Sequence, residues 1–196
     1  QWVGCIATFK AASSAYRFAF NGVYDENLGT YIVTGSANIT AYFESGEAAF
    51  TFTVNGTSVY APTVKPTYFS MAISDGTATI TREYWLTETE NTANITLYHA
   101  ATTAYVINFL DYTGILKTYQ YITASVNING ELAVVEQRKV DVQNSVTMEL
   151  VNGKKYQITI TNSEYYVYGD LLMTASTGVQ LTIRGAEFPK ETLLTQ

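Results

Sequence analysis

The sequence predicts an all-β protein, an antiparallel Ig-like or jelly-roll β-sandwich built as two sandwich halves. Its 196 residues are 47% hydrophobic and 14% aromatic, with 16 Tyr, and this composition favours strands. Apolar and polar residues alternate within short runs such as Val146 to Leu150, which is the period of a half-buried strand. Asn-Gly and Asp-Gly pairs separate several of these runs, and no segment between them has the period of a helix.

Each half contains about seven runs of this kind, the number and spacing expected of a sandwich. In the first half the expected strands are Tyr16–Phe20, Thr30–Thr34, Asn38–Phe43, Ala48–Val54, Tyr68–Ile73, Ala78–Tyr84 and Thr92–His99. In the second half they are Tyr105–Phe109, Tyr119–Ile128, Glu131–Val140, Ser145–Leu150, Lys155–Thr161, Tyr165–Leu172 and Val179–Arg184.

Four hairpins are predicted where two alternating runs meet at a glycine-containing turn, and the loop length is chosen so that both apolar faces stay together. The expected opposite pairs are Phe52 with Val59 and Met71 with Ile80 across two-residue loops, and Val126 with Leu132 and Met148 with Tyr156 across three-residue loops. In the three-residue loops we expect Gly130 and Gly153 to adopt the left-handed conformation.

The predicted domains are residues 1–15, a strand and linker, residues 16–101, the first sandwich half, and residues 102–196, the second half. Gln1–Phe9 is apolar and strand-like, whereas Lys10–Ala15 is small and flexible. The boundary between the halves is placed near Ala100–Thr103. A single larger jelly-roll-like sandwich is the alternative.

Charge and hydropathy exclude several classes of partner. The net charge is -6, charged residues make up only 14% of the chain, and no Lys/Arg cluster is present, which argues against nucleic acid and against an anionic membrane surface. No run approaches the 18 or so apolar residues of a membrane span. The surface is expected to consist of Thr, Ser, Asn and Tyr.

Several features suggest export to the cell surface or the extracellular medium. The chain begins at Gln1, as expected after removal of a signal peptide. Asn38, Asn55 and Asn94 each open an Asn-X-Thr sequon and are candidates for N-glycosylation, Asn55 at a turn tip being the best placed. The single cysteine, Cys5, excludes an intrachain disulfide and is expected to be a small buried hydrophobe.

No grouping of catalytic residues is found, so we expect the protein not to be an enzyme. His99 is the only histidine, and it ends an ordinary strand without a nucleophile motif beside it. Cys5 and His99 alone do not make a zinc site of the usual kind, so no metal site of that kind and no cofactor is expected, and N-glycans and calcium are the ligands left open. Asp25–Asn27 and Glu88–Asn91 offer oxygen ligands for calcium, but neither has a recognised loop spacing, and solvated turns are expected there.

Part of the second half resembles a known family. "AYVINFLDYTGI", "VNINGELAVVEQRKVD" and "NSVTMELVNGKKYQITITN" within residues 103–183 resemble transthyretin-like or CnaB-like β-sandwich repeats of microbial extracellular surface proteins. The matching positions are the Asp111 and Gly114 turn and Gly153 before Lys155 and Tyr156. The resemblance implies a structural or adhesive module. The Lys-Asn bond that such repeats often carry is not implied, because their first-strand lysine is missing from Tyr105–Phe109.

The favoured function is a repeating subunit of a pilus-like extracellular filament, a homopolymer assembled by donor-strand exchange. Residues 1–9 are too apolar for a solvated tail and are expected to complete the sheet of a neighbouring copy. The donor-strand candidates are Trp2, Val3, Cys5, Ile6 and Phe9. Alternatively, the segment is the first strand of its own sandwich.

The second hypothesis is a glycan- or receptor-binding adhesin or a viral fibre module that contacts glycans or a host surface. Its binding platform would be aromatic, formed by Trp85 or by Tyr165, Tyr166 and Tyr168. Strand alternation places Tyr166 and Tyr168 on one face and Tyr165 on the other, so part of this cluster is expected to be core.

Overall fold

The computed structural model of the chain describes residues 15–110, 120–140, 145–161, 166–172 and 180–184, and its side chains within 15–107, 121–140 and 145–159. Strands form throughout these ranges. The described residues contain no helix, and therefore no helix that is long and apolar enough to cross a membrane. The strands are β1 (Arg17–Asp25), β2 (Thr30–Tyr31), β3 (Ser36–Tyr42), β4 (Ala48–Asn55), β5 (Ser58–Tyr60), β6 (Tyr68–Ser74), β7 (Thr79–Trp85), β8 (Thr92–His99), β9 (Thr103–Leu110), β10 (Gln120–Ile128), β11 (Glu131–Val140), β12 (Ser145–Leu150), β13 (Lys155–Thr161), β14 (Tyr166–Leu172) and β15 (Gln180–Arg184).

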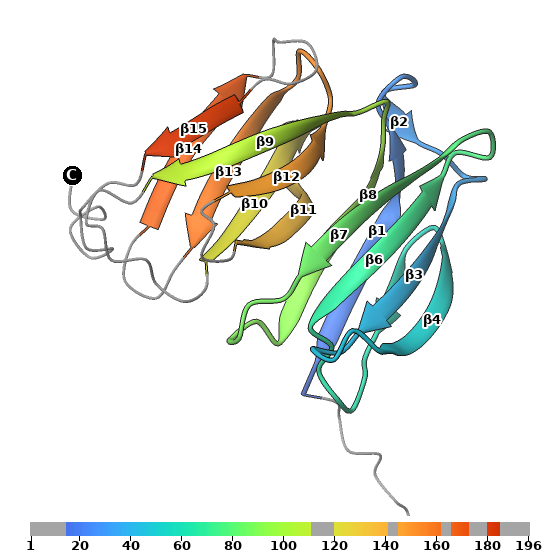
Figure 1. Cartoon of the computed structure of the whole chain (residues 1–196). Helices are drawn as coiled ribbons and strands as arrows, with labels where there is room; N and C mark the ends of the chain where they lie inside the picture. Colours follow the sequence, from blue (N-terminus) through green and yellow to red (C-terminus); the bar gives the residue numbers. More distant parts are fainter. Residues whose placement is uncertain (1–14, 111–119, 141–144, 162–165, 173–179, 185–196) are drawn as a thin grey trace, which may run out of the picture.

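The strands form three sheets, and the all-β sandwich class predicted from sequence is confirmed (Figure 1). The largest sheet has the order β14-β13-β10-β11-β7-β6-β3-β4. Its β7-β6-β3-β4 part packs on the sheet in which β1 pairs with β2, β5 and β8, and its other part packs on the β12-β9-β15 sheet. Most pairs are antiparallel, but β1 with β8, β7 with β11 and β9 with β15 are parallel.

Two clusters of buried hydrophobic side chains fill the molecule, one under each part of the large sheet. The first includes Phe18, Ile39 and Phe69, and the second includes Ile122 and Met148. The division into residues 16–101 and 102–196 as separate domains stays a prediction.

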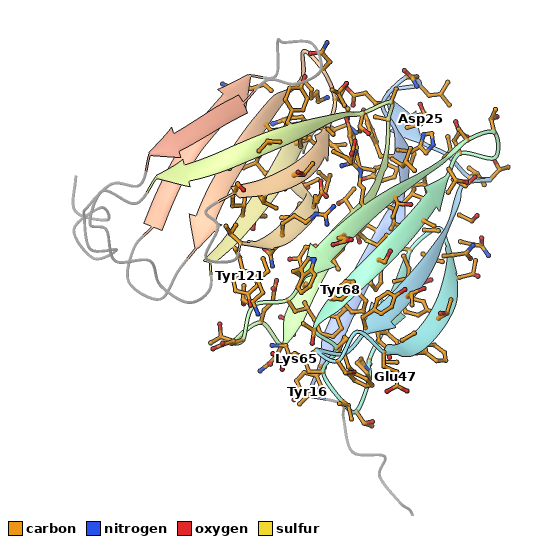
Figure 2. The ribbon with its side chains drawn as sticks, viewed as in Figure 1. Tyr16, Asp25, Glu47, Lys65, Tyr68 and Tyr121 are labelled. Carbon is orange, nitrogen blue, oxygen red and sulfur yellow. The ribbon has the colours of Figure 1, made fainter. Side chains whose placement is uncertain are left out.

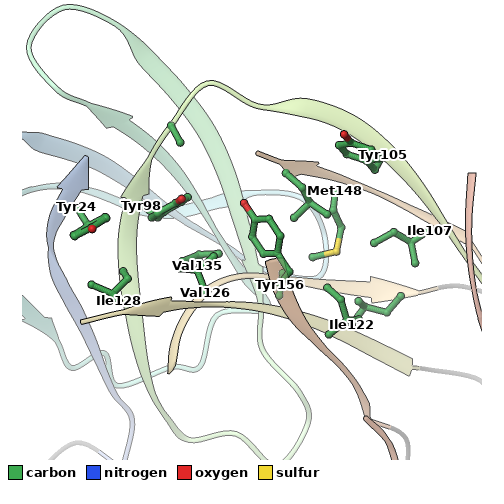
Figure 3. Packing of buried hydrophobic residues seen from close by; sticks show 14 of the residues in the cluster. Tyr24, Tyr98, Tyr105, Ile107, Ile122, Val126, Ile128, Val135, Met148 and Tyr156 are labelled. Atoms are coloured by element: carbon green, nitrogen blue, oxygen red, sulfur yellow. The ribbon is translucent and has the colours of Figure 1, made fainter. Parts of the chain in front are cut away.

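The two clusters are joined by strands of the first half that also contribute to the second core. The rings of Tyr24 on β1 and Tyr98 on β8 stack 6.0 Å apart and belong to the second cluster (Figure 3). The large sheet continues across the junction through a single parallel register pair, Tyr84 with Gln137. Because Tyr98 is fully buried in the second core, β8 packs on both halves.

Two of the predicted hairpins form, but in another register. Ile80 lies opposite Ile73 instead of Met71, a shift of two residues that leaves every side chain on the same face. Asp75 Oδ1 accepts hydrogen bonds from the amides of Thr77 and Ala78 and so holds this turn.

The β10–β11 hairpin closes with a two-residue loop, so the predicted pairing of Val126 with Leu132 is wrong. Asn129 and Gly130 both have positive φ, 54° and 93°, the signature of a type I′ turn. Leu132 is 56% exposed, and Val126 faces Ala133. A bulge beside Ala124 then shifts the register of the two strands, so later residues of β11 are buried while Leu132 stays exposed.

The other two predicted hairpins are wrong, because their strands belong to different sheets. β4 pairs with β3 and β5 with β1, whereas β12 pairs with β9 and β13 with β10 and β14. Gly153 has the predicted left-handed conformation, with φ 78°, but its loop crosses from one sheet to the other. Met148 and Tyr156 therefore meet across the second core instead of side by side in one sheet.

Candidate functional site

The free edge of the first sandwich is the candidate interaction surface. β4 is the last strand of the large sheet, and β5 borders β1 in the facing sheet. In the described part of the chain, each of these strands has a hydrogen-bonded neighbour on one side only. The open side of each strand therefore offers unpaired backbone N–H and C=O groups, which is the requirement for adding another strand.

An apolar hollow, called the edge groove below, lies along this edge. It has a volume of about 320 Å3 and is lined by Phe43, Ala49, Phe50, Tyr60, Pro62, Thr63, Val64 and Pro66. None of these side chains is charged. Phe50 is 52% exposed and Val64 61%, and the Phe50 and Tyr60 rings stack 5.8 Å apart between the two sheets. Exposed apolar surface beside an open strand is typical of an interaction surface.

The donor-strand candidates Trp2, Val3, Cys5, Ile6 and Phe9 lie outside the described residues. The described chain reaches this surface at the start of β1: Figure 2 shows Tyr16 at the same end of the first sandwich as Glu47, in the turn before β4. Tyr16 also packs against the first core.

His99 lies at the end of β8, where the structure brings it together with two carboxylates. Its Nδ1 atom is 3.5 Å from Asp25 Oδ2 and 3.8 Å from Asp75 Oδ2, and its Nε2 atom is 3.2 Å from the carbonyl oxygen of Ala78. Hydrogen bonds from the amides of Ala78 and Thr77 lower the pKa of Asp75. No hydroxyl or thiol of the described residues is bonded to His99, so a Ser-His-Asp arrangement is not formed by them.

A second buried polar group lies between the halves, around Arg82. This side chain is fully buried; its Nε donates to the carbonyl of Tyr98 and its Nη1 to that of Glu149, at 3.0 and 2.9 Å. Nη1 also lies 3.6 Å from Glu136 Oε2. Burial raises the pKa of Glu136, while Arg138 and Arg82 act in the opposite direction. These contacts join strands of both halves and indicate a structural role.

In each acidic segment considered for calcium, one glutamate is bonded to protein groups, whereas Asn27, Glu88 and Asn91 are exposed, as expected of solvated turns. Glu26 accepts hydrogen bonds from the Tyr98 hydroxyl at 2.5 Å and from Lys154 Nζ at 2.6 Å. Glu90 accepts hydrogen bonds from the Tyr84 hydroxyl at 2.8 Å and from Gln137 Nε2 at 2.9 Å. With these oxygens engaged, neither Glu26 nor Glu90 favours a calcium loop.

The three sequon asparagines are all exposed. Asn55 ends β4 beside Gly56, while Asn38 accepts a hydrogen bond from the Thr53 hydroxyl at 2.8 Å. Asn94 lines a hollow between β8 and residues of β11, including Glu131. Their exposure leaves all three as candidates for glycosylation.

The aromatic platform suggested from sequence is only in part described. The Trp85 ring stacks on Tyr68 at 4.3 Å, and Tyr68 stacks on Tyr42 at 4.7 Å, so these rings cover one another across β7, β6 and β3. Trp85 Nε1 donates to Glu83 at 2.7 Å. Tyr165 and the side chains of Tyr166 and Tyr168 lie outside the described set.

Asp75 is the residue that sequence reasoning missed. The sequence predicts Asp75 only as part of an Asp-Gly turn and offers Asp25 only as an oxygen ligand for calcium, without linking either residue to His99. Residues 25, 75 and 99 form no local motif, so the only signal is that each ends a strand or opens a turn.

Comparisons with known proteins give distant structural likenesses. No family model matches the chain, and no curated protein matches it. Among solved structures, the Bacillus anthracis TIE protein is similar at TM-score 0.33 and 14% identity over 87% of this chain, which spans only 34% of that protein. The shaft pilin SpaA from Lactobacillus rhamnosus GG has TM-score 0.33 and 12% identity, covering 89% of this chain and 98% of its own.

A minor pilin of Streptococcus agalactiae has TM-score 0.32 and 8% identity, covering 89% of this chain and 97% of its own. The solved structures that this chain is similar to at this level thus include pilins of Gram-positive bacteria.

Proposed function

We propose that the chain is a non-enzymatic extracellular structural protein, the repeating subunit of a pilus-like surface filament assembled by donor-strand exchange. In this assembly, residues 1–9 of one copy add as a strand to the β4 edge of the next copy and cover its edge groove. The observation that supports the proposal is the uncharged apolar groove beside an open strand edge.

The chemistry of the donor segment fits this surface. In an extended strand Val3, Cys5, Ala7 and Phe9 would share one face, and all four are apolar. An added strand would pair its backbone with the open side of β4 and bury these side chains against Phe50 and Val64. The contact joins two different surfaces of the subunit, so it does not close and generates a filament.

A fold-back of the same segment onto its own subunit is the competing arrangement. The linker at residues 10–15 reaches at most about 20 Å when extended, and β1 begins at the end of the sandwich that carries the β3–β4 turn. Both arrangements use the same groove, so an experiment has to separate exchange between copies from pairing within one copy.

Negative-stain microscopy of the native protein beside a version lacking residues 1–10 makes the first comparison. Filaments in the first sample and monomers in the second support exchange. Monomers in both samples overturn the proposal and favour the binding-module hypothesis.

A complementation experiment makes the comparison sharper. Cys5→Asp, in the middle of the apolar face, disables the donor segment and Phe50→Asp disables the edge groove, and each variant alone should stay monomeric. Mixed together they should form heterodimers, because each variant supplies the part that the other lacks. Ser45→Asp, an exposed turn substitution near β4, is the control and should still polymerise. A mixture that remains monomeric contradicts exchange.

Glycosylation at Asn38, Asn55 and Asn94 belongs to the same proposal of an exported protein. Intact-mass measurement on material from the native source tests it, and a mass equal to the bare 21.6 kDa chain would exclude glycans.

A further inference from the structure

Three side chains from distant parts of the sequence converge at one end of the first sandwich. Asp25 ends β1 and is the register partner of His99 at the end of the parallel strand β8. Asp75 lies in the β6–β7 turn of the facing sheet. One ligand atom from each of the three can be chosen so that all lie within 4.8 Å of one another. The cluster therefore joins the two sheets of this sandwich.

Hydrogen bonds leave one atom of each side chain directed at the centre of the cluster. Asp25 Oδ1 accepts from the Leu28 amide at 2.9 Å, and Asp75 Oδ1 accepts from two turn amides, so both residues keep Oδ2 toward His99. His99 Nε2 lies 3.2 Å from the Ala78 carbonyl oxygen, which accepts its hydrogen, and this contact turns Nδ1 toward the carboxylates. Metal-binding histidines and carboxylates are commonly oriented in this way by a second set of hydrogen bonds.

The distances at the centre are too long for hydrogen bonds and suited to a shared ion. Nδ1 of His99 is buried without a hydrogen-bond partner, and the whole residue is only 4% exposed. Its separations of 3.5 and 3.8 Å from the two Oδ2 atoms exceed the usual hydrogen-bond range. Two ligands on a tetrahedral ion, each about 2.0–2.1 Å from it, lie roughly 3.4 Å apart.

The negative charge of the two carboxylates also favours the binding of a cation. Asp25 is 3% exposed and the Asp75 side chain 23%, so two carboxylates are held close together with little water. Placing both carboxylate oxygens around the same nitrogen is unfavourable unless a proton or a metal ion lies between them. A divalent cation would neutralise the two carboxylates.

We propose that Asp25 Oδ2, Asp75 Oδ2 and His99 Nδ1 form a binding site for a divalent transition metal, with zinc the best match. Imidazole nitrogen with carboxylate oxygen suits zinc, whereas calcium prefers oxygen ligands alone. Water reaching the site past Asp75, the most exposed of the three, supplies the fourth ligand. The ion would tie β1 and β8 to the β6–β7 turn, next to the crossing of the chain into β9.

Zinc titration of the chelator-treated full chain, followed by calorimetry and by thermal unfolding, tests the site. We expect one zinc ion per chain and a higher melting temperature with zinc. Asp75→Asn retains the turn hydrogen bonds through its amide oxygen, so it should fold but bind zinc about 100-fold more weakly or not at all. Glu44→Gln, which removes an exposed carboxylate elsewhere, is the charge-matched control and should bind as the original chain does. Cys5→Ser should also bind unchanged, which excludes the thiol as the ligand.

The single histidine allows a direct readout. A long-range proton–nitrogen NMR spectrum of imidazoles contains signals from His99 alone. We expect a large change in the Nδ1 signal on adding zinc. No response of this signal to zinc would overturn the proposal, as would equal zinc binding by Asp75→Asn. A melting temperature that rises with calcium and not with zinc would also overturn it.

Discussion

Replacing Arg82 with methionine should strongly destabilise the protein, because Arg82 lies fully buried at the junction of the two halves. Methionine keeps much of the length of the side chain but removes the guanidinium group. The carbonyls of Tyr98 and Glu149 then lose donors at 3.0 and 2.9 Å, and Glu136 loses one of its two arginine neighbours.

The expected loss can be worked out from these contacts. Each hydrogen bond from a charged donor contributes about 1.5–3 kcal/mol, and breaking a buried ion pair typically costs about 3–5 kcal/mol. Arg138 Nε still donates to Glu136 Oε1 at 2.9 Å, so the carboxylate keeps one charged partner. We therefore expect a loss of about 3–5 kcal/mol, which for a chain of this size lowers the melting temperature by roughly 6–20 °C.

Urea denaturation followed by tyrosine and tryptophan fluorescence measures the loss, with the exposed Arg17→Met on β1 as the matched control. That control should change stability by no more than about 0.5 kcal/mol. The double variant Arg82→Met/Glu136→Leu should regain part of the loss, because it removes the buried carboxylate together with its partner. A loss below about 1 kcal/mol for Arg82→Met would refute the reasoning.

Three further substitutions test other features of the fold. Gly130→Val should lower the free energy of unfolding in urea by about 1 kcal/mol or more, because φ is 93° at this position. Gly130→Asn should lower it less, because Asn tolerates this conformation, and equal losses would contradict a backbone effect. Gly35→Ala should cost about 1–3 kcal/mol, since its Cβ would lie 2.6 Å from both Cδ1 and Cγ1 of Ile32, and adding Ile32→Ala, which removes both atoms, should recover part of that loss if this crowding is the cause. Tyr98→Phe should lower the melting temperature by removing the 2.5 Å hydrogen bond to Glu26, and Glu26→Gln should have a smaller effect when added to Tyr98→Phe than when made alone.

The glycine-containing turns show which features of the fold depend on local sequence. The left-handed conformations of Gly130 and Gly153 were predicted correctly, because an Asn-Gly pair limits the backbone whatever its neighbours do. The pairing partners of the same strands were predicted wrongly. A hairpin loop and a loop that crosses between sheets can have the same residues and the same alternation, so Met148 and Tyr156 fit either arrangement.

The candidate sites also differ in whether their residues are neighbours in the sequence or come together only in the fold. The candidate donor segment and the sequons were proposed from the sequence, because each is contiguous. The edge groove was not, since residues such as Phe43, Phe50 and Val64 come together only when β4 and the segment after β5 lie at one edge. Asp25, Asp75 and His99 are likewise brought together by the parallel pairing of β1 with β8 and by the sheet packed against them.

The sequence by itself determined that this chain forms strands, where most of them lie, and which glycines bend the backbone, because these properties depend on residues next to each other. The tertiary structure alone decided which strands are neighbours, which edge stays open and which polar side chains are buried together. A shift of two residues, or an exchange of one sheet for another, leaves the alternation unchanged. Packing across the two cores, where Tyr98 and Arg82 join both halves, selects among these arrangements.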